Sequence, residues 1–122
     1  TLCLAGNCFQ NLTMEAIGTW LTTKDCQLEN IGLGSQQGQY DLDVSAIVVA
    51  LKSNRSVRVL DLSGNRLKDD AVVDLWGSLK ENTTLRHICL QNNELTDDAV
   101  VALTGALPFL SLRSIRLEGH AY

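Results

Sequence analysis

The chain has 122 residues, of which 45 % are hydrophobic, and a formal net charge of −4 with acidic and basic residues interspersed. This length and composition suit one domain with a hydrophobic core. The strongly basic footprint of a nucleic-acid-binding protein is missing, and no run approaches the roughly 18 consecutive apolar residues of a membrane helix. We therefore expect neither a nucleic-acid partner nor insertion into a membrane.

In chain order, the sequence repeats one pattern of a short strand, a tight loop and a helix. The first unit covers residues 1–27 and carries Ile17 and Leu21 four apart on its helix. Its strand-and-loop positions are Leu2, Leu4, Asn7 and Phe9. The chain therefore opens inside a strand pattern, without the polar cap that a terminal repeat needs. We expect it to be a piece of a longer array.

The second unit, residues 28–56, is irregular. It has Gln36 where its neighbours have asparagine, and no apolar anchor follows until Tyr40 or Leu42. Its apolar strand positions are Leu28, Ile31 and Leu33. The pattern predicts a longer, more mobile loop that could contact a partner, followed by a helix from Val44 to Leu51.

The third and fourth units, residues 57–84 and 85–111, are nearly two copies of one phrase, and residues 112–122 form a partial fifth unit. Both copies contain the run DDAVV on the helix. They share apolar or asparagine residues at Val57/Leu85, Leu60/Ile88, Leu62/Leu90, Asn65/Asn93, Leu67/Leu95, Leu75/Leu103 and Leu79/Leu107. From the second unit on, the units begin at Leu28, Val57, Leu85 and Leu112, so the spacing is nearly constant.

Repeats of roughly 20–29 residues that carry LxxLxLxxNxL are typical of leucine-rich repeats. VRVLDLSGNRL and LRHICLQNNEL, with their DDAVV helices, resemble the ribonuclease-inhibitor-like class of that family. The resemblance implies an α/β solenoid, a right-handed β-α superhelix arc with parallel strands on the concave face and helices on the convex face. Alanine stands where the family often has glycine at the helix start, and Gln36 and His120 replace the asparagine.

Recurrent polar residues have structural explanations. Asn7, Asn65 and Asn93 form a predicted asparagine ladder, because an amide side chain both donates to and accepts from backbone groups where strand becomes loop. The acid pairs Asp69-Asp70 and Asp97-Asp98 lie at expected helix starts, where carboxylates accept from free N–H groups. No glycine-kinked loop accompanies these acids, so we expect no metal site.

The outward strand positions carry the candidate partner-binding residues. They combine basic, acidic, thiol and amide groups on the concave face: Arg58, Arg86, Arg113, Arg116, His87, Asp61, Cys89 and Gln91. Three of the arginines would stack as a row of like charges on adjacent strands, which is unfavourable unless something offsets it. Either the row pairs with Asp61, Glu29 or solvent, or it docks an acidic partner through planar bidentate contacts.

His87, Cys89 and Asp61 together are the inventory of a nucleophilic site, since His87 and Cys89 are two apart on one strand and Asp61 lies on the next. An open parallel sheet, however, offers no pocket that excludes water and no oxyanion donors. We therefore expect no enzyme, no cofactor and no small-molecule substrate.

The cysteines Cys3, Cys8, Cys26 and Cys89 have no CxxC spacing. Cys3 and Cys89 are three strands apart, about 14 Å at the usual strand spacing and beyond disulfide reach. Reduced cysteines predict a cytoplasmic protein, with the nucleus as the alternative.

Two tryptophans and three asparagine tripeptides have both a structural and a functional interpretation. Trp76 lies on the core-facing side of its helix, whereas Trp20 points outward and marks either a groove between helices or a contact on the convex side. Asn11, Asn54 and Asn82 begin tripeptides that match the glycosylation signal, but Asn82 also belongs to a helix-end phrase, ENTTL, shared by cytosolic members of the class.

The function that this resemblance implies is a protein-protein interaction module within a larger intracellular protein. The alternatives are a regulator like the Ran GTPase-activating proteins, for which Arg66 and Asn65 are the candidate loop residues, an actin-regulatory protein of the tropomodulin or capping-protein-regulator kind, and a NOD-like receptor.

Overall fold

A computed structural model describes residues 2–3, 11–34 and 43–118, in which short strands alternate with helices. The helical elements are α1 (Asn11–Leu21), α2 (Ser45–Leu51), α3 (Asp69–Leu79), α4 (Asp97–Ala106) and the 3-10 turn η1 (Leu107–Phe109). The strands are β1 (Leu2–Cys3), β2 (Asn30–Gly32), β3 (Val59–Asp61), β4 (His87–Cys89) and β5 (Ser114–Arg116). From β2 to β5 the strands begin at nearly constant intervals along the chain.

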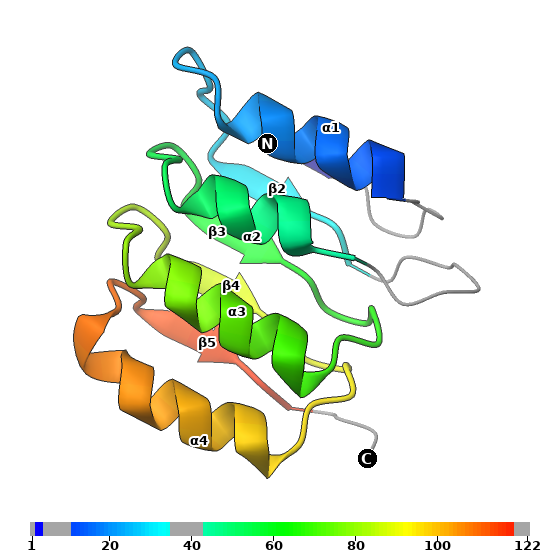
Figure 1. Cartoon of the computed structure of the whole chain (residues 1–122), viewed down its shortest axis with the longest axis vertical. Coiled ribbons are helices and arrows are strands. Elements are labelled where there is room, and N and C mark those ends of the chain that lie inside the picture. Colours follow the sequence, from blue (N-terminus) through cyan, green and yellow to red (C-terminus); the bar gives the residue numbers. More distant parts are fainter. Residues whose placement is uncertain (1, 4–10, 35–42, 119–122) are drawn as a thin grey trace.

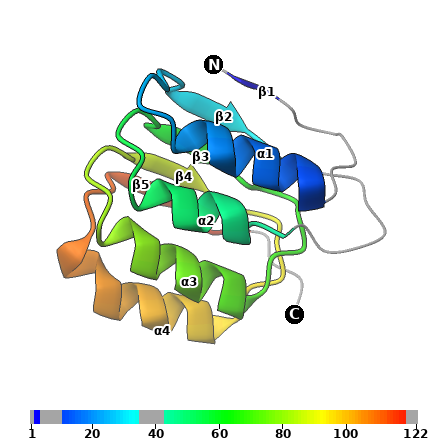
Figure 2. The ribbon, with the colours of Figure 1, turned by 45° about the horizontal axis from the view of Figure 1, so that its top comes forward.

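All five strands are parallel and lie in sequence order, β1-β2-β3-β4-β5. The helices form a second layer over one face of this sheet, stacked in the same order (Figures 1 and 2). Each unit thus contacts the units next to it in sequence, which confirms the predicted α/β repeat solenoid. No helix among the described residues is long and apolar enough to cross a membrane.

The core lies between the two layers. Each complete three-residue strand turns its middle side chain toward the helices, so Ile31, Leu60 and Ile88 stand side by side and are almost fully buried. Burying one such side chain contributes about 1.5–3 kcal/mol. Trp76 is buried as predicted, and its indole N–H donates to the Ala99 carbonyl of α4 at 3.3 Å, while Trp20 is outward as predicted and 46 % exposed.

The predicted asparagine ladder is present at Asn65 and Asn93, both buried where strand becomes loop. Asn93 Nδ2 donates to the Leu62 carbonyl of the preceding unit at 3.1 Å. Its Oδ1 accepts from the backbone N–H groups of Asn65 and Leu67, at 2.8 and 3.0 Å. Each ladder amide therefore ties two successive units together. Asn7 and the predicted loop after Gly34 lie outside the described residues.

A second ladder, which the sequence analysis did not identify, runs along the helix ends. Asn82 Nδ2 donates to the Leu51 and Asn54 carbonyls of the preceding unit, and its Oδ1 accepts from the N–H of Leu85, the first residue of the following unit, at 2.7 Å. Asn54 bonds in the same way to the Leu21 carbonyl and the Val57 N–H. Both side chains are buried, so these two glycosylation tripeptides have a structural explanation.

The acid pairs lie in the first turns of α3 and α4, as predicted. Only some of the hydrogen bonds expected between these carboxylates and the N–H groups at the helix starts are present. Asp70 Oδ1 accepts from the adjacent Ala71 N–H, but Asp69 turns to the following unit, where it accepts from the backbone N–H and the hydroxyl of Thr96. Thr96 in turn caps α4 by accepting from the Asp98 N–H. Asp69 thus links two units instead of capping its own helix.

Helix α2 begins at Ser45, one residue after the predicted start, because Val44 serves as its N-cap. Asp43 Oδ1 accepts from the Ser45 N–H at 2.9 Å. Hydrogen bonds from the Ser45 side chain and backbone hold the pKa of this carboxyl below its usual value, since they favour the ionised form. Asp43 is therefore charged at the start of α2.

We expect Asn82→Ala to lower the free energy of unfolding by about 2–4 kcal/mol, because it leaves several buried backbone groups without partners. Urea denaturation measures this change. The matched control is Thr83→Ala, whose side chain is exposed and should change stability by less than about 0.5 kcal/mol. Equal effects of the two substitutions would contradict the role assigned to the second ladder.

Two helix glycines are expected to respond oppositely to alanine. A Cβ at Gly18 of α1 would lie 2.9 Å from the Ala46 carbonyl oxygen, whereas one at Gly77 of α3 would meet no atom within 4 Å. Gly18→Ala should therefore destabilise the fold by about 1–3 kcal/mol through overpacking. Gly77→Ala should stabilise it by up to about 1 kcal/mol, the difference in helix propensity. Thermal unfolding of both variants tests this pair, and a stabilised Gly18→Ala protein would contradict the close approach of α1 and α2.

Candidate functional site

The sheet face that points away from the helices is called the open sheet face below. Two rows of side chains cross it from strand to strand, on either side of the buried middle row. The first row is Asn30, Val59, His87 and Ser114. The second row is Gly32, Asp61, Cys89 and Arg116. These residues are half-buried or exposed, so both rows are accessible to solvent or to a partner.

The second row contains a polar cluster whose geometry is largely fixed. Ser63 holds Asp61 in place, because both its hydroxyl and its backbone N–H donate to Asp61 Oδ1, at 2.6 and 2.9 Å. On the far side of Cys89, Arg116 Nη2 donates to Glu118 Oε1 at 2.9 Å. The strand register brings Asp61, Cys89 and Arg116 together as the sequence predicted.

Cys89 lies between these charged groups and is a free thiol. Partial burial raises the pKa of the Cys89 thiol, and the nearby Asp61 carboxylate raises it further, while Arg116 acts in the opposite direction. A thiol nucleophile needs the reverse, a pKa lowered by neighbouring positive charge.

The three arginines at the strand starts lie on neighbouring strands, since the Arg86 and Arg113 N–H groups donate to the Arg58 and Arg86 carbonyls. Their side chains differ. Arg58 Nε lies 4.0 Å from Glu29 Oε1, with both side chains exposed. Arg86 Nη1 instead donates to the carbonyls of Thr83 and Ser111, at 2.7 and 3.3 Å. Arg113 is exposed, so Arg58 and Arg113 are the more available members of the row.

The remaining candidates lie at the end of the strands. Gln91 is half-buried, and its buried Oε1 has no hydrogen-bond partner in the described part of the chain. Asn65 is buried within the ladder, whereas Arg66 is exposed with a positive φ of 59°. Of the two loop residues considered for a regulator of GTP hydrolysis, only Arg66 can reach a partner.

In the regions described, no group of three or more histidine, cysteine, aspartate or glutamate side chains could hold a metal ion.

Two grooves lie in the helix layer, one between α1 and α2 and one between α2 and α3. The sequence analysis considered a groove between helices only at Trp20, which lines neither of these two. The small residues Ala71 and Ser78, seven apart on one side of α3, are a signal for space beside that helix.

Comparison with known proteins identifies the repeats. A family model described as "Leucine Rich repeat" matches residues 53–75 and 81–103. Among the solved structures, "Leiomodin-1 Actin-Binding Site 2 (ABS2)" is similar with a TM-score of 0.71 and 20 % sequence identity, over 92 % of this chain and 63 % of that chain. The chain thus spans less than two thirds of that structure, and at this identity the likeness concerns the fold. A search of the curated proteins finds no match.

The environment of Cys89 predicts how its thiol titrates. Asp61→Asn keeps an oxygen that can accept from Ser63 but removes a negative charge, so the Cys89 pKa should fall. Arg116→Gln removes a positive charge, so the Cys89 pKa should rise. The pH dependence of iodoacetamide labelling, followed by mass spectrometry of the Cys89 peptide, measures both shifts. Glu29→Gln should leave the profile unchanged, and a shift in the opposite direction in either variant would contradict the arrangement of the second row.

Proposed function

The chain is a leucine-rich repeat protein, and from this premise we propose that it binds another protein through its open sheet face. One observation carries the proposal. Positions that face the helices or the ladders repeat from unit to unit, while the positions in the first and second rows of the open sheet face do not. Leu60 and Ile88 are both large aliphatic residues in the core, and Asn65 recurs as Asn93.

The non-repeating positions lie in the two outward rows. Asparagine, valine, histidine and serine occupy the first row, and glycine, aspartate, cysteine and arginine the second. Packing requires none of these side chains, because the sheet is covered by helices on one face only (Figure 2). A surface whose shape is set by the repeats and whose chemistry differs at each strand suits recognition of one particular partner.

The charge on this face favours a partner with carboxylates. Arg58, Arg86, Arg113 and Arg116 outnumber Glu29, Asp61 and Glu118 by one (4−3). An exposed ion pair such as Arg58 with Glu29 contributes only about 0–1 kcal/mol, so Arg58 can exchange its partner at little cost. Arginine also forms bidentate bonds with carboxylates, which gives such an interface geometric specificity.

The proposal contains no catalytic step, no cofactor and no small-molecule substrate, and it extends to a cytoplasmic location. Cys26 and Cys89 are free thiols, which is the usual state of cysteines in a reducing compartment. Cys26 is half-buried near the end of α1, where its sulfur accepts weakly from Ser56.

Actin is the second candidate partner, because the similar structure bears the name of an actin-binding site. Titration of fluorescently labelled monomeric actin and co-sedimentation with filaments test this candidate directly. No binding in either assay would remove actin while leaving the broader proposal in place. A regulator of Ran-type GTP hydrolysis has less support, since Asn65 is occupied in the ladder.

The open sheet face is tested by reversing charge where the fold does not need it. Arg58→Glu combined with Arg113→Glu should reduce partner capture from cell extract about tenfold or more, the scale of losing two charged contacts at an interface. Arg86 is left unchanged because it bonds to backbone carbonyls. Quantitative mass spectrometry of captured proteins is the measurement.

The matched control for this double variant is Val101→Glu, an exposed position on α4 in the helix layer. Proteins lost only with the arginine variant are partners of the open sheet face. If every captured protein persisted with the arginine variant and was lost with Val101→Glu, the open sheet face would not be the binding surface.

A further inference from the structure

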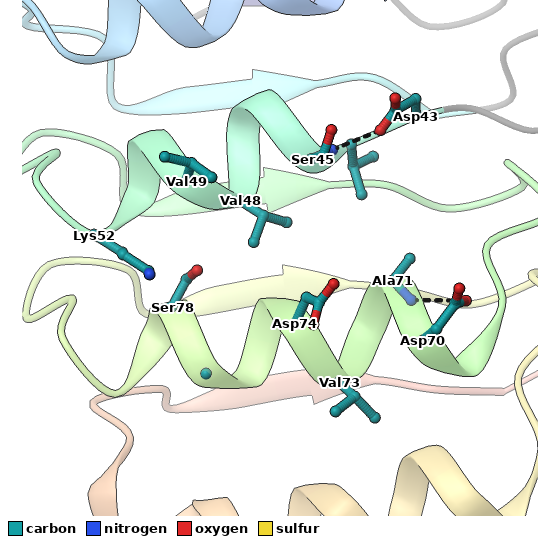
Figure 3. A pocket seen from close by; sticks show the side chains of 12 residues that line it. Asp43, Ser45, Val48, Val49, Lys52, Asp70, Ala71, Val73, Asp74 and Ser78 are labelled. Carbon is teal, nitrogen blue, oxygen red and sulfur yellow. Dashed lines mark hydrogen bonds between the residues drawn. The ribbon is translucent and has the colours of Figure 1, made fainter.

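A groove of about 550 Å³ runs between α2 and α3 on the helix layer, on the opposite side of the molecule from the open sheet face. Figure 3 shows its lining side chains coming from both helices. The residues of α2 that line it are Ser45 and the residues 3, 4 and 7 positions after it, Val48, Val49 and Lys52. This spacing places the four side chains on one side of the helix. The groove is therefore elongated along the helices.

Apolar side chains from both helices line the groove. Val49 is 63 % exposed and Val73 is 43 % exposed, although both are large aliphatic side chains. Gly77, across the groove on α3, leaves the space open, because a Cβ there would meet no atom within 4 Å. An aliphatic side chain of a partner could enter this space and cover both valines.

Its charged side chains are mostly acidic. Asp43, Asp70 and Asp74 line the groove, against the single cation Lys52. Asp43 and Asp70 lie at one end and Lys52 at the other (Figure 3). Lys52 Nζ lies 4.0 Å from Glu81 Oε2, so an acid outside the groove already faces that cation. The N-termini of two helices supply at most about half a positive charge each, which three carboxylates outweigh.

We propose that this groove binds a basic amphipathic helix of a partner protein. Its apolar side chains pack against Val48, Val49 and Val73, and its lysine or arginine side chains face Asp43, Asp70 and Asp74. The seven residues of α2 span about 10 Å, close to two turns of a helix. An open groove lined by charged side chains suits a polypeptide helix, whereas small-molecule sites enclose most of their ligand. This surface is separate from the open sheet face and can be tested independently.

The probe is a helical peptide of about 15 residues built from leucine and lysine, near the length at which isolated helices begin to form. Its counterpart carries glutamate in place of every lysine. The lysine peptide should bind and shift the NMR methyl resonances of Val48, Val49 and Val73, and added salt should weaken it. Asp74→Asn should weaken it by about twofold to fivefold, the range of one exposed ion pair.

Gly77→Leu adds a large side chain at a position that lines the groove, where its Cβ would meet no atom within 4 Å, and should weaken the lysine peptide about tenfold or more, the effect of losing an apolar contact of this size. Gly105→Leu is the matched control, because Gly105 occupies the corresponding position of the next helix, α4, also with no atom within 4 Å, and lies outside this groove. It should bind as the unmodified chain does.

Several results would overturn the proposal. The first is that the glutamate peptide binds as tightly as the lysine peptide. The second is that neither peptide binds. The third is that the Gly77→Leu variant binds the lysine peptide as tightly as the unmodified chain does. Shifts of the same valine methyl groups on concentrating the chain alone would identify a second copy as the occupant, and would also overturn it.

Discussion

The structure depends on buried asparagine side chains that replace the backbone hydrogen bonds a longer sheet would supply. The complete strands, β2 to β5, are only three residues long, so many backbone groups of a unit lie in the turns that join strand to helix and have no partner in the sheet or the helices. A buried backbone group without a partner costs about 1–3 kcal/mol. Asn65 and Asn93 satisfy such groups at the carboxyl ends of the strands, and Asn54 and Asn82 do so at the carboxyl ends of the helices. Each amide bonds to the unit before its own, so neighbouring units stabilise one another.

These internal bonds leave the surface free to vary. Leucine, isoleucine and asparagine supply many of the contacts that hold one unit to the next, with Asp69 and Trp76 adding hydrogen bonds between units, and none of the side chains on the open sheet face takes part in the ladders. The partial exceptions are informative. Arg86 is tied to two loop carbonyls and Asp61 to Ser63, so the face combines fixed groups with exposed groups such as Arg113 and His87. A partner would therefore meet a surface that is partly preorganised, which lowers the entropy cost of binding.

The repeated positions are what the sequence could predict. The spacing of Leu60 and Ile88, and of Asn65 and Asn93, sets the parallel register, the buried row and the first ladder, because the same packing problem recurs in every unit. The direction of a long side chain was not predictable, since Arg86 can reach loop carbonyls as readily as solvent. The second ladder was missed because Asn82-Thr-Thr matches a glycosylation signal as well as a helix end. Assignment to the ribonuclease-inhibitor-like class stays a prediction.

The volume of the groove could not be predicted either, since it depends on the distance between two helices and not on any one residue. The position of the groove allows both surfaces to be occupied at the same time. The open sheet face and the groove lie on opposite sides of one close-packed core, so occupants of the two surfaces do not collide. Coupling between the two binding surfaces would require an element of the fold that has two arrangements. Each occupant would also have to bind one of these arrangements more tightly than the other. Leu60, Leu62, Leu75 and Leu79, which lie between the two surfaces, are almost completely buried, and close-packed interiors of this kind deform little. Two partners should therefore bind independently, and the repeat array can hold both at once.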